Sequence, residues 1–68
     1  MRNLITIIDN IVKVAPDLED NFKSLRSSVL YSAPELMSFR WWQAADILNT
    51  FAEKHPKSDE IAKIFNGT

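Results

Sequence analysis

Prolines and the spacing of apolar residues divide the chain into four segments with helical periodicity. Pro16, Pro34 and Pro56 separate the segments, and the single glycine, Gly67, comes after the last of them. Within the segments apolar residues recur three and four positions apart, as in amphipathic helices, and no hairpin turn signal is present. The pattern predicts an all-α fold: a compact bundle of four helices at about 3–14, 17–31, 34–54 and 58–66, the last one short.

Residues typical of helix ends support these boundaries. Ser32 and Glu35 have the spacing of a capping box at the start of the third segment. Ser58 precedes two acidic residues at the start of the fourth, which suits the positive end of a helix dipole. Asn66 and Gly67 form a typical C-terminal stop.

The width of the apolar face differs between the four predicted helices. In the segments 3–14 and 34–54 the apolar residues cover about half of the circumference. The segment 17–31 has only a narrow stripe, made of Leu18, Phe22, Leu25 and Val29. The last segment offers only Ile61, Ile64 and Phe65. We therefore expect a bundle built around the first and third helices, with the second at the periphery and the fourth as a short lid.

The composition indicates one small domain, residues 1–68, without the disulfides or metal sites that often stabilise small proteins. There are no cysteines and only one histidine, so helix packing has to supply the stability. The net charge is −1, and both signs are scattered along the chain, which argues against a general polyanion binder. The apolar run near Ile5 is too short for a membrane span or a secretory signal, and we expect a cytoplasmic protein with no membrane partner.

The residue types needed for catalysis do not occur in a recognisable arrangement. His55 stands without clustered ligands, so no metal or other cofactor is expected. Asp46 and Glu53 are seven residues apart on one helix face, a spacing typical of solvated surface acids. No glycine lies inside the domain to form a phosphate-binding loop. The chain is therefore expected not to be an enzyme.

Two aromatic residues break the helical pattern of the third segment. Phe39 and Trp42 project onto its polar side and, being three residues apart, are neighbours on the helix surface. One interpretation is that Leu30 and Tyr31, before the turn at Pro34, cover them. The other is that they form an exposed aromatic pair that anchors a partner or a second copy of the chain.

Arg40 breaks the pattern in the opposite direction, because it projects into the apolar arc of the same helix. Its aliphatic stem could lie along the core while the guanidinium reaches water. Alternatively, Arg40 forms an ion pair, either at an interface or with Asp17, Glu19 or Asp20 across the bundle. Both interpretations remain open from the sequence.

Together these features favour a small non-catalytic interaction module that binds a protein partner, with a homodimer as the leading hypothesis. The expected contact surface joins apolar residues of the first helix to the aromatic pair and the nearby charges: Ile5, Ile8, Val12, Phe39, Arg40, Trp42 and Asp46.

Two alternatives come from different classes. In size and make-up the chain is similar to small phage or bacterial inhibitor and immunity proteins, which are compact, mildly acidic and without active sites. Such a protein would act as a monomer on a larger protein through an acidic, aromatic face that includes Asp46 and Glu53. The second alternative is a nucleic-acid-binding helical domain, which the scattered charges make unlikely.

Overall fold

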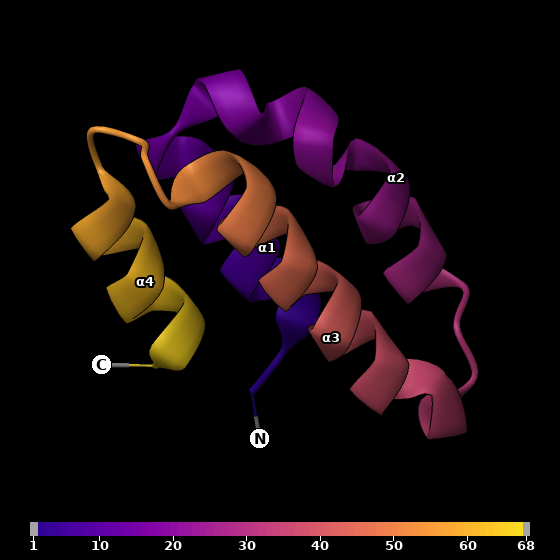
Figure 1. The fold of residues 1–68 in the computed structure, drawn as a ribbon. Coiled ribbons are helices and arrows are strands. Elements are labelled where there is room, and N and C mark those ends of the chain that lie inside the picture. The colour runs from indigo at the N-terminus through magenta and orange to yellow at the C-terminus, as the bar shows by residue number, and fades with distance from the viewer. Residues whose placement is uncertain (1, 68) are drawn as a thin grey trace.

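Helices make up most of residues 2–67, which are the part of the chain that the computed structural model describes. Within these residues the α-helices are α1 (Leu4–Val14), α2 (Glu19–Leu30), α3 (Met37–Ile47) and α4 (Ser58–Asn66) (Figure 1). Short 3-10 turns, Pro16–Leu18 and Pro34–Leu36, lead into α2 and α3, and a π-helical turn, Leu48–Ala52, extends α3. The predicted all-α fold and its four helices are confirmed.

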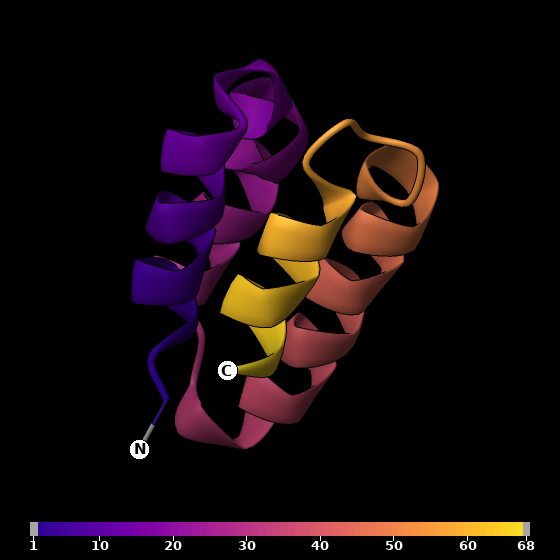
Figure 2. The same cartoon turned by 90° about the vertical axis from the view of Figure 1, so that its left-hand side faces the viewer.

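The four helices run alternately up and down around a shared interior. α1 packs against α2 and α4, and α2 also packs against α3. Viewed from the side, α4 lies between α1 and α3, so that α1 and α3 are diagonal to each other (Figure 2). The packing between α3 and α4 is sparse in comparison with these contacts.

The buried core is dominated by α1 and α2. α1 buries four large aliphatic side chains, Leu4, Ile7, Ile8 and Ile11. α2 buries Phe22, Leu25 and Val29, whereas α3 buries only Ala44. The expectation of a central third helix and a peripheral second helix is therefore wrong. A narrow stripe of large residues that lies between two neighbours contributes more core than a wide arc that has only one close neighbour.

Local capping explains where some of the helices begin and end. The Asn3 side-chain oxygen accepts hydrogen bonds from the backbone N–H groups of Ile5 at 2.9 Å and Thr6 at 3.3 Å, which satisfies two free donors at the start of α1. Gly67 ends α4 with a φ of 78°, a left-handed conformation that glycine adopts without strain. The predicted capping box is wrong, because Ser32 bonds elsewhere and Ala33 precedes the turn at Pro34–Leu36 without a side-chain cap.

An ion pair and a histidine–carboxylate hydrogen bond link segments that are far apart in the sequence. Arg26 of α2 donates to both carboxylate oxygens of Asp9 on α1, at 2.8 and 3.1 Å. This hydrogen bonding lowers the pKa of Asp9 below its ordinary value and raises that of Arg26. His55, in the turn before α4, lies 3.0 Å from Asp17, and the hydrogen bond lowers the pKa of Asp17.

The hydrogen bonds of His55 favour one tautomer of its neutral ring. The Lys57 backbone N–H donates to Nδ1 at 3.0 Å, which requires a lone pair on that nitrogen. Nε2 then carries the proton and donates to the Asp17 carboxylate. The ring thus ties the turn before α4 to the start of the second helical segment, which gives it a structural role.

Candidate protein-binding surface

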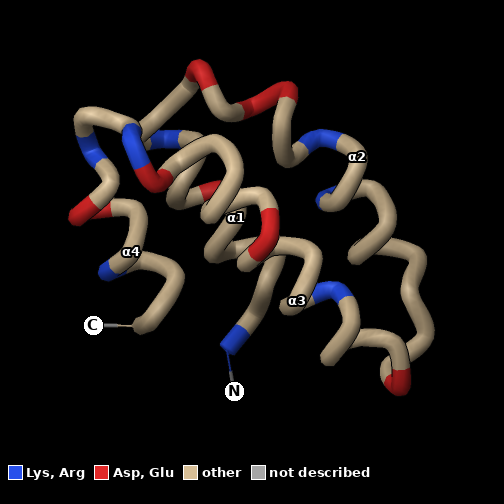
Figure 3. Tube along the Cα trace, viewed as in Figure 1, with Lys and Arg blue, Asp and Glu red and all other residues tan. Residues whose placement is uncertain are grey.

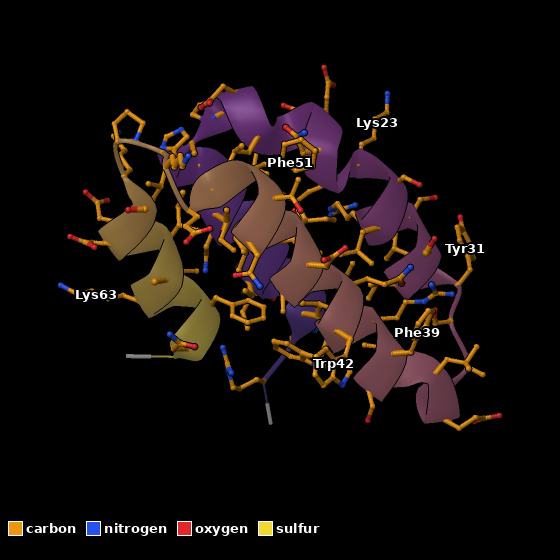
Figure 4. All side chains as sticks on the ribbon, in the orientation of Figure 1. Lys23, Tyr31, Phe39, Trp42, Phe51 and Lys63 are labelled. Atoms are coloured by element: carbon orange, nitrogen blue, oxygen red, sulfur yellow. The ribbon has the colours of Figure 1, made fainter. Side chains whose placement is uncertain are left out.

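Large apolar side chains that the core does not use lie between the end of α2 and the middle of α3. We call this set the aromatic surface: Leu30, Tyr31, Leu36, Phe39 and Trp42. Tyr31 is 87% exposed, Trp42 76% and Phe39 57%. Tyr31 and Phe39 lie at the end of the molecule where α2 connects to α3, and Trp42 lies further along, near the middle of α3 (Figure 4). The interpretation that Leu30 and Tyr31 cover the aromatic pair is wrong, because both of these residues are themselves more than half exposed.

The direction of the aromatic pair follows from the rotation of α3. Ala44 is the buried residue of this helix. At about 100° per residue, Trp42 projects roughly 160° away from Ala44, on nearly the opposite side of the helix. Asp46 lies one turn beyond Trp42 on the same side and is also exposed. α3 therefore presents Phe39 and Trp42 to the outside, while the one side chain that it buries fully is small.

Arg40 braces the start of α3 through uncharged partners. Its Nε donates to the Ser32 hydroxyl at 2.7 Å, and its Nη1 donates to the Gln43 side-chain oxygen at 2.6 Å. The Ser32 hydroxyl in turn donates to the Ser28 carbonyl at 2.6 Å, so the chain of bonds joins α3 to the end of α2. Within residues 2–67 no carboxylate lies in ion-pair range of Arg40, so the alternative of an ion pair with Asp17, Glu19 or Asp20 is wrong.

The guanidinium of Arg40 also contributes to the aromatic surface. It lies 5.7 Å from the centre of the Phe39 ring, within the range of a cation–π interaction. Arg40 itself is half-buried. It therefore acts as a support for the exposed ring, and its two hydrogen bonds are to residues of its own chain.

Next to Trp42 the surface is hollowed between α3 and the end of α4. This hollow is lined by Ser38, Trp41, Trp42, Ala45 and Phe65. The rings of Trp41 and Phe65 are tilted by 58° with their centres 5.6 Å apart, a favourable aromatic contact that joins the two helices. The Arg2 guanidinium lies 4.9 Å from the centre of the Trp41 ring.

A second hollow continues from the first, because Ala45 and Phe65 line both. It runs between the π-helical turn Leu48–Ala52 and α4. Apolar residues that include the buried Ala52 and Ile61 form its floor, and polar residues form its rim: Asn49, Glu53, Ser58, Asp59 and Asn66. We call the two hollows together the α3–α4 groove. It exists because α4 packs on α1 and leaves its side toward α3 loosely covered.

The residues of the first helix do not join this surface. Ile8 is 1% exposed and lies in the core, so its predicted place in a contact surface is wrong. Ile5 and Val12 are half-buried and pack against the core. Val12 lines a separate hollow between α1 and α2, together with the pair of Asp9 and Arg26. The wide apolar arc of α1 is covered because two helices, α2 and α4, pack against it.

The charged residues do not form a single basic face. Lys and Arg are spread over all four helices and alternate with Asp and Glu (Figure 3). Within residues 2–67 no group of three or more potential metal ligands comes together, and no helix is long and apolar enough to cross a membrane.

Comparison with known proteins adds no relative. No family model matches the chain, and no curated protein or solved structure matches it. The function therefore has to be argued from the surface itself.

Some features of this surface could not be predicted from the sequence pattern. Leu36 belongs to the apolar arc of the segment 34–54 but is exposed, whereas Trp41 and Phe65 pack against the core as expected and also line the groove. Tyr31 already departed from the stripe of its own helix, and that departure was the available signal for its exposure. The groove had no sequence signal, because it depends on which helix α4 packs against.

Proposed function

We propose that the chain is a small, non-catalytic module that acts by binding another protein through the aromatic surface. The observation that carries this proposal is the exposure of Tyr31, Phe39 and Trp42, which follow one another from the end of α2 to the middle of α3. Aromatic side chains are enriched among the residues that dominate binding energy, and a cluster of exposed apolar groups marks an interaction site more often than an isolated one. The proposal keeps the cytoplasmic location expected from the sequence, which fractionation of host cells would test.

The fold has little use for these side chains, which supports a role in binding. Trp42 is three-quarters exposed, so most of its surface remains in contact with water in the free protein. A Trp side chain can bury about 150–250 Å² in a contact. Burying this apolar surface against a partner would therefore favour binding, because folding alone leaves it in water.

Charge favours a protein partner over nucleic acid. Glu35, Asp46 and Glu53 are exposed along the helical segment that carries the aromatic surface. Their charges would repel phosphate groups, since binding to a nucleic-acid backbone depends on Lys and Arg. The same acids fit the monomeric, inhibitor-like alternative, in which an acidic and aromatic face meets a larger protein.

The homodimer hypothesis loses part of its expected surface. Ile8 is in the core. Val12 lines the hollow between α1 and α2, which shares no residue with the hollow beside Trp42. A second copy would have to use the aromatic surface alone. Sedimentation equilibrium at micromolar concentration separates the two cases: a mass of one chain favours the monomeric module, and a mass of two chains favours self-association.

The decisive experiment compares Trp42→Ala with a matched control. Each tagged variant captures proteins from its native host, the captured protein is identified by mass spectrometry, and binding is then measured with the purified partner. Phe51→Ala is the control, because Phe51 is an aromatic residue of the same helical segment that is 49% exposed but lies away from the aromatic surface (Figure 4). We expect Trp42→Ala to weaken binding at least tenfold with an unchanged helical circular dichroism signal. Equal binding by both variants would refute the proposal.

A further inference from the structure

We propose that the α3–α4 groove seats a basic amphipathic helix of the partner protein. The inference builds on the function proposed above and specifies the chemical character of the partner. Trp42 connects the two regions, since it belongs to the aromatic surface and also lines the groove.

The shape of the groove fits a helix. Its α3 side extends from Trp42 to Glu53, which at about 1.5 Å per residue corresponds to roughly 16 Å, or three turns of a partner helix. Small residues, Ala45 and Ala52, lie on this side and let another helix approach closely. A helix in such a groove places apolar residues at positions i, i+3 or i+4, and i+7 on the floor.

The π-helical turn Leu48–Ala52 gives the groove an unusual wall. Within residues 2–67 this is the one π-helical turn, and it lines the groove through Leu48, Asn49 and Ala52. Turns of this type are rare and frequently occur at functional sites. Its position is independent of the exposure of the aromatic residues.

The charges on the rim of the groove determine which sign of charge a partner helix should carry. Both charged residues that line the groove, Glu53 and Asp59, are acidic and exposed. Lys63 of α4 points away from α3 (Figure 4). Exposed carboxylates on opposite sides of an apolar floor attract a helix with Lys or Arg on its flanks and repel an acidic one.

The aromatic end of the groove already binds a guanidinium of its own chain. Arg2 stacks over Trp41 at 4.9 Å, which shows that this end accommodates a cation against an indole ring. Trp42 next to it has no such cover and is available to a partner. A Lys or Arg near one end of the partner helix would use the same interaction.

A second copy of this chain does not supply such a helix. The apolar face of α1 is buried in its own core, and the exposed side of α3 is acidic. The first turn of α4 carries Asp59 and Glu60. The groove therefore fits a different protein better than it fits another copy.

Two synthetic helical peptides of about 14 residues, or four turns, test this inference. They share the same leucines on one face and carry either lysines or glutamates at all other positions. Binding to the full chain is followed by Trp fluorescence and by backbone amide NMR shifts at near-physiological salt. We expect the lysine peptide to bind at least tenfold more tightly than the glutamate peptide and to shift the amides of Ala45, Ala52 and Ala62.

Charge reversal on the rim provides the matched control. Asp59→Lys should weaken binding of the lysine peptide severalfold, and adding Glu53→Lys should bring the loss to about tenfold, because each change replaces attraction by repulsion. Glu60→Lys alters the neighbouring acid in the same turn of α4 but lies outside the groove lining, and should leave binding nearly unchanged. Circular dichroism confirms that each variant is folded.

The outcomes separate this inference from the proposed function. Equal binding of both peptides, no binding of either, or shifts confined to Tyr31 and Phe39 would overturn the groove assignment. If capture of the host partner still depends on Trp42 in those cases, the proposed function stands without the groove. If the lysine peptide fills the groove while Trp42→Ala leaves the host partner bound, the aromatic surface is the part that fails.

Discussion

Replacing Ile8 by a smaller residue tests whether α1 is a core helix. Ile8 lies in the middle of α1, is 1% exposed and belongs to the same buried cluster as Ile11 and Phe22. Truncating it removes apolar contacts and leaves a cavity that a close-packed interior cannot fully close. The change touches no charged or hydrogen-bonding group, so its effect reports packing alone.

The expected cost follows from the atoms that are removed. Ile8→Ala deletes three carbon atoms, which at about 0.8 kcal/mol each gives about 2.4 kcal/mol before the cavity is included, within a usual range of about 2–5 kcal/mol. A chain of 68 residues has a free energy of unfolding of about 3–10 kcal/mol. Ile8→Ala is therefore expected to remove between about a quarter and all of this free energy of unfolding. Ile8→Val removes one carbon at a cost of about 0.5–1.5 kcal/mol and keeps the fold measurable.

Urea denaturation followed by circular dichroism measures this cost. With an m-value of about 1 kcal/mol per molar urea, Ile8→Val should lower the midpoint by about 0.5–1.5 M. Trp42→Ala removes a much larger side chain, but from an exposed position, and should change the free energy of unfolding by no more than about 0.5 kcal/mol. An unchanged midpoint for Ile8→Val together with a lowered one for Trp42→Ala would reverse the roles assigned to these residues.

Three further predictions concern polar contacts. Asn3→Ala should lower the free energy of unfolding by about 0.5–2 kcal/mol in urea, because α1 loses its N-cap; an equal loss in the exposed control Asn10→Ala would contradict this. Arg26→Met should raise the pKa of Asp9 toward its ordinary value in an NMR titration. Because the pKa of Asp9 is lowered in the folded state, the pair with Arg26 stabilises the protein above the ordinary pKa. This stabilisation is lost as pH falls through the lowered value, so the free energies of unfolding of wild type and Arg26→Met should converge in acid. Arg40→Met should shift the urea midpoint by the same amount at low and high NaCl, since its partners are uncharged; a shift that shrinks with salt would reveal an ion pair.

Local sequence features predicted the helices well for a physical reason. Proline cannot continue a helix and a glycine can end one, so Pro16, Pro34 and Gly67 mark boundaries independently of how the helices pack. The helical period then gives the side of each helix on which a residue lies. That rule was sufficient to separate Phe39 and Trp42 from the apolar arc of α3, and the structure places both at the surface.

Packing partners could not be predicted in the same way. The period shows the direction of a side chain but not which helix stands there. α1 and α3 have apolar arcs of similar width, yet α2 and α4 cover the first while α3 has only α2 as a close neighbour. Ile8 consequently became core, and Leu36 became surface. The partners of Arg40 could not be predicted for a related reason. Ser32 comes close through the turn between α2 and α3, Gln43 is one helical turn away, and uncharged side chains give no signal of pairing.

Stability and binding are assigned to different residues of this small domain. The interior depends on residues of α1 and α2 and on Ile61 of α4, whereas α3 buries Ala44 and exposes Phe39 and Trp42. In a chain with only a few kcal/mol of net stability, a Trp that supported both the core and a partner contact could not change without loss of the fold. Because Trp42 lies on the side of α3 away from Ala44, a partner can cover it without displacing any core contact. The comparison of Ile8→Val with Trp42→Ala therefore bears on function as well as on stability. If both variants lower the free energy of unfolding of the free protein by similar amounts, Trp42 belongs to the fold. Its burial by a partner would then add no binding energy that folding has not already used.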